Sequence, residues 1–316
     1  MSSDQESVRL KYEGVLTCTT APGFCQAVQA ALRGDVTSLQ LNLEEVKHAD
    51  AVGLAALLQA TRHARARGIA CSILPSAVVY RALLRAELLD ELPLKGPGGG
   101  ADLTEVTEAV LDDSALTPIA ASGRIVLRPP AWDELGLFAQ WANEPLLDQM
   151  VGSPLLYHCR HTGPYHPEFV ARALYDPTAL TLLIQSTERG SSPVGFVRLH
   201  GIHLVERFAF VETALGDAGS LRKGWGVEAS RLALAYAMDT LEVHRVEAKV
   251  YAYNVLSINA LRRNGFDLEG VLREARSYDG RRWDVLVFAI LEPEMHVQRA
   301  RDGFPPMGLW PSDAGT

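Results

Sequence analysis

The sequence predicts an α/β protein built of two domains, a smaller one first and a larger mixed-sheet one second. The chain has 316 residues, enough for two ordinary cores. Its 47% hydrophobic and 22% charged residues are typical of a globular protein. A Gly-Pro-Gly-Gly-Gly run at 96–100 separates two halves in which strand-like and helix-like segments alternate. The predicted parts are a first domain (1–93), an acidic Gly/Pro-rich linker (94–122), a second domain (123–292) and an irregular Pro-rich tail (293–316).

Composition narrows the class of protein. The net charge of −8 gives no overall attraction for nucleic acid. Four scattered cysteines without a CxxC pair indicate reduced thiols in a cytoplasmic protein. The first residues lack the apolar core of a signal peptide, and the longest apolar runs are too short to span a membrane. We therefore expect a cytoplasmic protein that binds neither membrane nor nucleic acid.

The first domain alternates strands and helices. Extended segments at 8–14 and 15–20 precede a helix at 22–34, in which Pro22 suits the first turn. A strand at 37–46, a helix at 48–68, a strand at 69–75 and a helix at 76–94 with Ser76 as N-cap complete the series. This order predicts a small α/β layer with helices on one side.

The turn into the second of these helices reads Asp50-Ala51-Val52-Gly53. With its flanking strand and helix, it resembles the STAS family of anti-sigma-factor-antagonist-like domains over about residues 6–93. That family has Asp-Ser-Ser-Gly at this turn, with a phosphorylatable serine. Both hydroxyl positions are absent here, so the family's switch cannot operate. The resemblance implies a module that docks a partner or substrate, with Asp50 as a structural N-cap and Gly53 as a packing glycine.

The second domain begins with a strand at 125–128 and a helix carrying Leu135, Phe138 and Trp141 at helical spacing. Strands follow at 180–187, 193–204 and 208–217, the first two joined by a turn at 188–193. A helix at 226–241, a strand at 245–252 and a helix at 257–265 come next. A hairpin around Asp279-Gly280 closes the domain. The result is a mixed-sheet α/β domain.

Two glycines interrupt the start of the helix at 226–241, in Arg222-Lys223-Gly224-Trp225-Gly226. Glycine costs helix stability there, and close approach of a phosphate to backbone N–H groups would repay that cost. Further along come Asn254-Val255-Leu256-Ser257, Arg263-Asn264-Gly265-Phe266, Glu269-Gly270 and Asp284. Together these motifs resemble the GNAT superfamily of N-acetyltransferases over about residues 123–292, in particular the Rim-type branch that acetylates ribosomal-protein N-termini. The departure is Leu221, where the family loop begins with Arg or Gln.

This resemblance implies transfer of an acetyl group from acetyl-CoA to an amine. It places the pyrophosphate of coenzyme A on the loop from Arg222 through Val227, and the end of the strand 210–215, including Leu215, beside the thioester. Asn254 would bind the pantetheine arm, and Ser257 would donate a hydrogen bond to the leaving sulfur. For Ser257 the competing structural role is N-cap of the next helix. Trp225 is expected to pack on the sheet or to shield the phosphates.

The general base is the part of the family pattern that this chain matches least well. Phe210 stands where many GNAT members have a glutamate, and Glu212 lies two residues on, on the same strand face. Glu212 is therefore the expected base, with an ordinary strand carboxylate or a water relay as alternatives. Some Rim-type members have a glutamate in the hairpin, where this chain has Arg276, with Glu274 two residues earlier. Tyr278 is a candidate acid or substrate contact.

A histidine-rich segment lies outside the pattern. We expect Tyr157, His158, Tyr165 and His166 to line the acceptor mouth or to pack. His158, Cys159, His161 and His166 are spaced too loosely to predict a metal site, so no metal is expected.

Three functions are open at this stage. The first is an acetyl-CoA-dependent N-acetyltransferase acting on a protein or peptide N-terminus, or on a small amine such as an antibiotic or its intermediate. The second is a non-catalytic acyl-CoA sensor with an interaction role. The third is transfer of a longer acyl chain. The STAS-like domain would bind a partner or substrate, or pair subunits as a homodimer.

Overall fold

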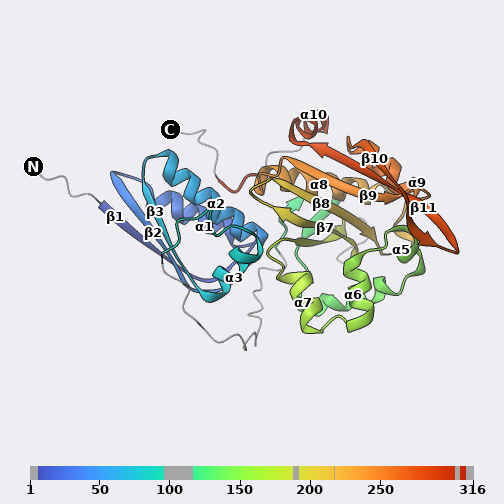
Figure 1. The fold of residues 1–316 in the computed structure, drawn as a ribbon, viewed down its shortest axis with the longest axis horizontal. Coiled ribbons are helices and arrows are strands. Elements are labelled where there is room, and N and C mark those ends of the chain that lie inside the picture. Colours follow the sequence, from blue (N-terminus) through green and yellow to red (C-terminus); the bar gives the residue numbers. More distant parts are fainter. Residues whose placement is uncertain (1–5, 96–116, 188–191, 217, 303–306, 311–316) are drawn as a thin grey trace, which may run out of the picture. The chain divides into compact units, whose positions relative to one another are not determined.

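The computed structural model describes residues 6–95, 117–187, 192–216, 218–302 and 307–310. The predicted turn at 188–193 and most of the predicted linker lie outside these residues. Two compact units are present: Met1–Ser114 with Gly308–Thr316, and Ala115–Met307 (Figure 1). Both units combine sheets with helices, so the predicted α/β class is confirmed. In the described part of the chain, no helix has the length and hydropathy needed to cross a membrane.

The N-terminal unit contains a parallel sheet of three strands in the order β1-β2-β3. Leu39, Leu41 and Leu43 of β2 form the buried centre of its apolar face. Phe24 of α1 packs edge-on against Tyr12 of β1, with ring centroids 5.2 Å apart. The elements are β1 Glu6–Leu16, α1 Ala21–Ala31, β2 Val36–Ala49, α2 Ala51–Ala66, β3 Ala70–Pro75 and α3 Ala77–Arg85.

Two predicted elements of this unit differ from the structure. The two opening segments form one strand, β1, which runs from Glu6 to Leu16. The helix expected over 76–94 ends at Arg85, although Ser76 caps it as predicted. Glu87 adopts a left-handed φ of 57°, and Leu88 N–H donates to the Leu83 carbonyl at 2.9 Å. This is a Schellman motif, in which the left-handed position is usually glycine. Because glutamate stands there instead, the sequence does not indicate that the helix ends at this point.

The predicted turn at the start of α2 is a tightly bonded N-cap. The Asp50 carboxylate accepts from Val52 and Gly53 N–H at 2.9 Å each and from Cys18 N–H at 2.8 Å. Burial raises the pKa of Asp50, while these three N–H donors oppose that shift. A Cβ added to Gly53 would lie 2.0 Å from the Leu16 carbonyl oxygen, so glycine is required by packing. Both residues therefore have the structural roles expected of them.

The C-terminal unit is built on one mixed sheet, in the order β10-β11-β9-β8-β7-β6-β5-β4 over the described residues. Its neighbours pair antiparallel apart from β8 and β9, which pair parallel. The strands are β4 Ala120–Ala121, β5 Ile125–Arg128, β6 Leu180–Ser186, β7 Pro193–His203, β8 Phe208–Leu215, β9 Arg245–Tyr251, β10 Asp267–Tyr278 and β11 Arg281–Leu291.

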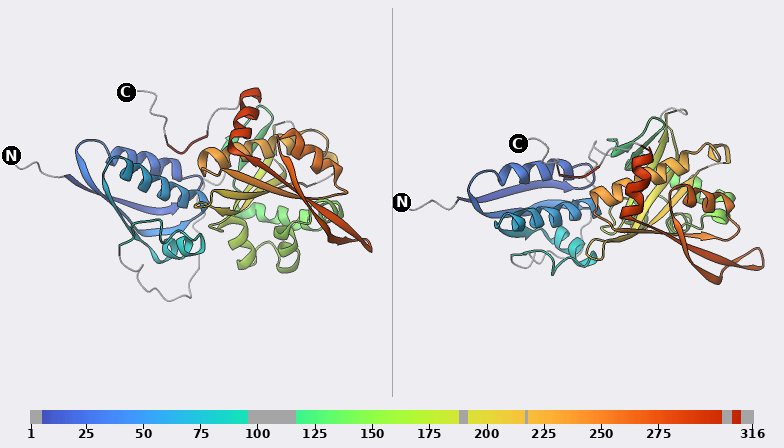
Figure 2. Two further views of the ribbon diagram at one scale, coloured as in Figure 1. Left: turned by 45° about the horizontal axis from the view of Figure 1, so that its top comes forward. Right: turned by 90° about the horizontal axis from the view of Figure 1, so that it is seen from above.

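Helices cover both faces of this sheet (Figures 1 and 2). On one face Phe138, Trp141, Phe169 and Phe196 form an aromatic core beneath the helices α4 to α7. On the other face α8 buries Trp225 completely. The helices are η2 Trp132–Glu134, α4 Leu135–Ala142, α5 Pro145–Met150, α6 Pro154–Thr162, α7 Pro167–Leu174, η3 Ala218–Ser220, α8 Trp225–Thr240, α9 Val255–Arg263 and α10 Glu292–Asp302.

The structure corrects the expectation for the residues after Glu292 and confirms the hairpin that precedes them. Residues after Glu292 were expected to be irregular, but Glu292–Asp302 form the helix α10. Glu294 accepts from Leu291 N–H at 2.8 Å, and Arg299 pairs with Asp239 of α8 at 2.7 Å, which holds the helix in place. The hairpin at Asp279-Gly280 is confirmed, with positive φ at both residues as a type I′ turn requires.

Candidate active site

The two central parallel strands separate at one end. β8 and β9 pair at Phe208, Ala209 and Phe210 and at no further described position. Beyond this point β8 continues to Leu215 paired only with β7, and β9 continues to Tyr251 paired only with β11. The facing edges of 211–215 and 248–251 therefore carry peptide groups without partners in the ladder. This opening in the sheet is the centre of the candidate site, and it contains the predicted strand segment 210–215.

The glycine loop lies at the start of α8 and follows β8 and the short helix η3 in the chain. Gly224 is the N-cap and has a φ of +84°, a left-handed conformation that favours glycine. Gly226 does not need to be glycine for internal packing, because an added Cβ would meet only Leu215 and Thr213 at 3.5 Å or more. The first N–H groups of a helix have no acceptor within the helix and carry its positive dipole end. The loop backbone can thus receive an anion.

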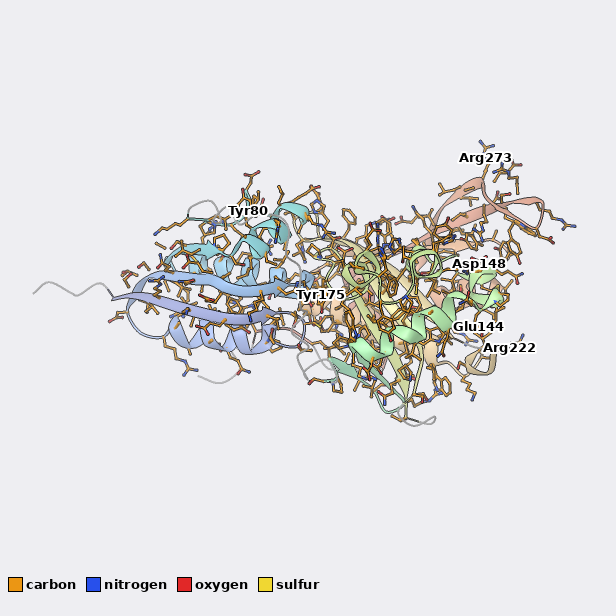
Figure 3. The ribbon with its side chains drawn as sticks, turned by 90° about the horizontal axis from the view of Figure 1, so that it is seen from below. Tyr80, Glu144, Asp148, Tyr175, Arg222 and Arg273 are labelled. Atoms are coloured by element: carbon orange, nitrogen blue, oxygen red, sulfur yellow. The ribbon has the colours of Figure 1, made fainter. Side chains whose placement is uncertain are left out.

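Cations surround this loop. Arg222 and Lys223 are exposed, and Arg222 is labelled in Figure 3. The Lys223 ammonium lies over the Trp225 ring, 4.6 Å from its centroid. A third cation, Arg124, was not predicted from the sequence; it precedes β5 and donates to the Lys223 carbonyl at 2.7 Å. Its guanidinium lies 3.7 Å from the position of a Cβ on Gly224 and the same distance from Glu228. Trp225 itself is in the core, so its side chain packs on the sheet and only its backbone faces the loop.

Asn254, not Ser257, caps α9. The Asn254 Oδ1 accepts from Ser257 N–H at 3.0 Å, and Ser257 is the third residue of the helix. The prediction of Ser257 as N-cap is therefore wrong, since the cap lies one turn earlier. The Asn254 Nδ2 donates to the Met150 carbonyl and to Ser257 Oγ, both at 2.8 Å. Because Ser257 Oγ accepts here, its own proton is free to be donated elsewhere.

Helix α9 connects the serine to the glycine loop. Asn264 at its C-terminal end donates to the Val227 carbonyl at 3.0 Å, which fixes this end beside the first turn of α8. Seven residues separate Ser257 from Asn264, or about 10 Å at 1.5 Å per residue. The anion-binding loop and the Ser257 hydroxyl are thus joined by one rigid helix. The predicted contact of Asn254 with pantetheine stays a prediction, since its side chain is 1% exposed and already bonded.

Glu212 is positioned on β8 within the opening. Its cross-strand neighbour is Arg198 of β7, and it accepts a hydrogen bond from Ser153 at the start of α6. Its Oε1 is shielded from solvent and has no hydrogen-bond partner among the described residues. Burial raises the pKa of the Glu212 carboxyl, against the Ser153 bond and the Arg198 charge, which lower it. A carboxylate with a raised pKa is suited to accept a proton.

An aromatic group lies at the end of β9, and the charge of Glu212 acts on the hydroxyl of its Tyr251. Tyr253 Oη donates to the Gln149 carbonyl at 2.7 Å, and its ring is 5.9 Å from that of Tyr278 and 5.0 Å from Trp283. Tyr251 contacts Arg276, whose guanidinium carbon lies 4.6 Å from its ring centroid. Tyr278 therefore belongs to this aromatic group, and its role as a substrate contact stays a prediction. Glu274 is exposed in a bulge of β10, where its N–H donates to Asp284.

The histidine-rich segment follows Ser153, the N-cap of α6, and continues to the start of α7. His158 pairs with Glu168 at 3.6 Å, and His166 caps α7. Tyr157 and Tyr165 are 62% and 48% exposed, and Tyr165 packs against Trp132. Within the described ranges, no hydrogen bond or ion pair joins these four side chains to Glu212 or Ser257, so their role at the acceptor mouth stays a prediction. No group of three His, Cys, Asp or Glu residues that could hold a metal ion occurs in the same ranges.

Comparisons with known proteins agree with this geometry. Residues 124–267 match the model of the acetyltransferase (GNAT) domain family, and residues 1–93 match that of the Mlab-type STAS domain. A probable N-acetyltransferase of Bacillus subtilis, YjcK, is 40% identical over 72 residues, which cover 23% of this chain and 40% of that protein. The chain thus spans about two fifths of the length of the curated relatives it matches.

Two solved structures are also similar. The spermidine N-acetyltransferase of Vibrio cholerae, in complex with CoA and spermine, is 18% identical with a TM-score of 0.48, covering 55% of this chain and 99% of that one. RimJ of Mycobacterium smegmatis, in complex with CoA-disulfide, is 21% identical with a TM-score of 0.45, covering 59% and 91%. On the family match and the site geometry, the C-terminal part of the chain is a GNAT acetyltransferase domain, preceded by an N-terminal part that matches the STAS domain.

Proposed function

We propose that this protein is an acetyl-CoA-dependent N-acetyltransferase that acetylates a primary amine. The observation that carries the proposal is the opening between β8 and β9, with the glycine loop at one end of α9 and the Ser257 hydroxyl near the other. The acceptor is a protein or peptide N-terminus, as in the Rim-type branch, or a small amine. The N-terminal STAS-like unit would dock the partner or substrate in the cytoplasm.

The glycine loop would hold the coenzyme through its pyrophosphate. The N–H groups at the start of α8 meet the negative charge, and Arg222, Lys223 and Arg124 surround it. Gly224 supplies the left-handed turn. Gly226 has no side chain that would keep a phosphate away from the backbone N–H groups. Leu215, at the end of β8, would lie beside the thioester arm.

Transfer needs a neutral amine, a polarised carbonyl and a protonated leaving sulfur. Glu212 would take the proton from the attacking ammonium, because its carboxylate is shielded and its Oε1 lacks a partner among the described residues. The amine nitrogen then bonds to the carbonyl carbon while the carbon–sulfur bond breaks. A ladder-free N–H of residues 211–215 would polarise the carbonyl oxygen. Ser257 Oγ accepts from Asn254, so its own proton can be directed at the leaving sulfur. As the sulfur protonates through this hydroxyl, the second proton of the attacking nitrogen passes back to the serine oxygen, which leaves a neutral amide, a thiol and an unchanged serine.

These features favour turnover over a non-catalytic acyl-CoA sensor. A sensor would need the loop and the pantetheine contacts, but not a shielded carboxylate on the strand that borders the opening. The combination of Glu212 and an oriented Ser257 hydroxyl is therefore better explained by catalysis.

The test compares two substitutions of Gly224. Gly224→Ala and Gly224→Glu both impose the left-handed strain, about 1 kcal/mol, but only the second adds a carboxylate where the phosphates would sit. Calorimetry with acetyl-CoA should show near-parental affinity for the alanine variant and no measurable binding for the glutamate variant. Thiol release with a panel of amines then reports transfer. Equal affinity in the two variants would remove the phosphate site from this loop.

A further inference from the structure

Arg276 holds a positive charge beside the opening without an acidic partner. It lies on β10 opposite Trp283, on the same sheet face as Tyr251. Its guanidinium stacks on the Tyr251 ring at 4.6 Å and lies 5.8 Å from the Tyr278 ring. Its Nη2 donates to the Asp148 carbonyl oxygen at 3.3 Å, which is a neutral group. Within the part of the chain that the structure describes, no carboxylate lies at ion-pair distance from it.

The nearby carboxylate of Asp148 does not neutralise this charge. That side chain pairs with Arg160 of α6 at 3.3 Å instead. The Arg276 Nε is shielded from solvent and makes no hydrogen bond with any described residue. A half-buried guanidinium normally satisfies several of its five donors, so spare donors here are unusual.

Tyr251 lies within electrostatic reach of both this cation and the expected base. Its ring stacks under Arg276, and both Glu212 and Arg276 act electrostatically on its hydroxyl. A Cβ on Gly152 would lie 2.1 Å from that hydroxyl, so the loop before α6 closes over the ring. The surroundings of Tyr251 therefore combine a carboxylate suited to an amine with a guanidinium suited to an anion.

We propose that Arg276 is a specificity-determining residue that binds a carboxylate of the acceptor, so that the preferred acceptor is an amine with a carboxylate close by, such as a peptide whose second residue is acidic. This inference rests on the proposed acetyl transfer to amines. Guanidinium and carboxylate match in geometry, and aromatic stacking orients the guanidinium before binding. A polycationic amine would instead place its second charge against Arg276 and be disfavoured.

The experiment uses three amidated tripeptides, Ala-Asp-Ala, Ala-Asn-Ala and Ala-Lys-Ala. Their binding to the full-length chain saturated with CoA is measured by calorimetry, and thiol release from acetyl-CoA is measured separately. A charge-assisted pair predicts that the parent binds the aspartate peptide about tenfold more tightly than the asparagine peptide, and the lysine peptide most weakly. Arg276→Gln should abolish the difference between aspartate and asparagine, and Arg276→Lys should retain part of it.

Arg273→Gln is the matched control. It removes the same charge from the same strand, and Arg273 is exposed and projects outward into solvent (Figure 3). The control should keep the parental preference. Equal parental affinity for the peptides, no measurable binding of any of them, or a preference that survives in Arg276→Gln would each overturn the proposal. A binding preference without thiol release would uphold it while counting against acetyl transfer.

Discussion

The substitution Asn254→Asp separates the structural role of this residue from its effect on Ser257. An aspartate still accepts from Ser257 N–H, so the cap of α9 survives and gains from the helix dipole. It cannot donate, however, whereas the Asn254 Nδ2 donates both to the Met150 carbonyl and to Ser257 Oγ. The Ser257 hydroxyl would turn to donate to the new carboxylate, and its proton would no longer be available for the leaving sulfur.

The expected magnitudes follow from these bonds. Leaving the Met150 carbonyl without its donor costs about 1–3 kcal/mol of unfolding free energy, partly offset by a better cap. Loss of one hydrogen bond to a developing thiolate costs about 1.5–3 kcal/mol of transition-state stabilisation, which is roughly a ten- to hundredfold fall in kcat. Acetyl-CoA affinity should change much less, since the bond to sulfur strengthens only as the carbon–sulfur bond breaks.

The assay is a double-mutant cycle with Ser257→Ala. If Asn254 acts on catalysis by holding the Ser257 hydroxyl, each single variant should lower kcat similarly, and the double variant should fall little further. Chemical unfolding gives the stability of each variant in parallel, and calorimetry gives the affinity for acetyl-CoA. Parental kcat in Asn254→Asp, or additive losses in the double variant, would refute the proposed orientation of the serine.

Two further predictions concern Glu212 and the N-terminal unit. Glu212→Gln should lower kcat by about 10²–10⁴ and abolish the fall in kcat/KM that the parent shows as pH drops through the raised pKa of this carboxyl. Because the pKa of Glu212 is higher in the folded state, its ionisation destabilises the fold as the pH rises. The glutamine variant should therefore be more stable than the parent at alkaline pH and should lose this advantage in acid. Identical pH profiles of activity in parent and variant would exclude Glu212 as the base. Gly53→Ala should lower the unfolding free energy of the N-terminal unit by about 2 kcal/mol, because its Cβ would lie 2.0 Å from the Leu16 carbonyl oxygen; an unchanged urea midpoint for that unit would contradict this packing role.

Local chemistry explains which parts of the fold the sequence predicts well. The start of α8 at Gly224, the cap of α2 at Asp50 and the turn at Asp279-Gly280 each depend on residues within one turn of each other. Two of the expectations that failed involve boundaries without their usual turn residue. Helix α3 ends on a left-handed Glu87 where glycine is common, and α10 begins immediately after β11 with no turn residues between them.

The same distinction between local and long-range interactions applies to the candidate site. Glu212 could be predicted because side chains two residues apart share a strand face, and the parity survives without knowing the partner strands. Arg124 and Ser153 could not be predicted, because their relevance arises from contacts with Lys223 and Glu212 that are distant in sequence. The pairing of Arg276 with Tyr251 likewise depends on the register of β10, which two bulges shift. No periodic pattern in the sequence encodes such a shift.

The number of N–H groups on the Asn254 side chain also limits how this residue can form a hydrogen bond to the coenzyme. Its amide has two N–H groups, and both are used, one by the Met150 carbonyl and one by Ser257 Oγ. A pantetheine carbonyl could gain a bond from Asn254 only by displacing one of them. Displacing Ser257 would release the hydroxyl that is proposed to protonate the sulfur, whereas displacing Met150 would free the end of α5, next to the carbonyls that hold Arg276 and Tyr253. Coenzyme binding through Asn254 would therefore be coupled to the acceptor side of the site, through α5.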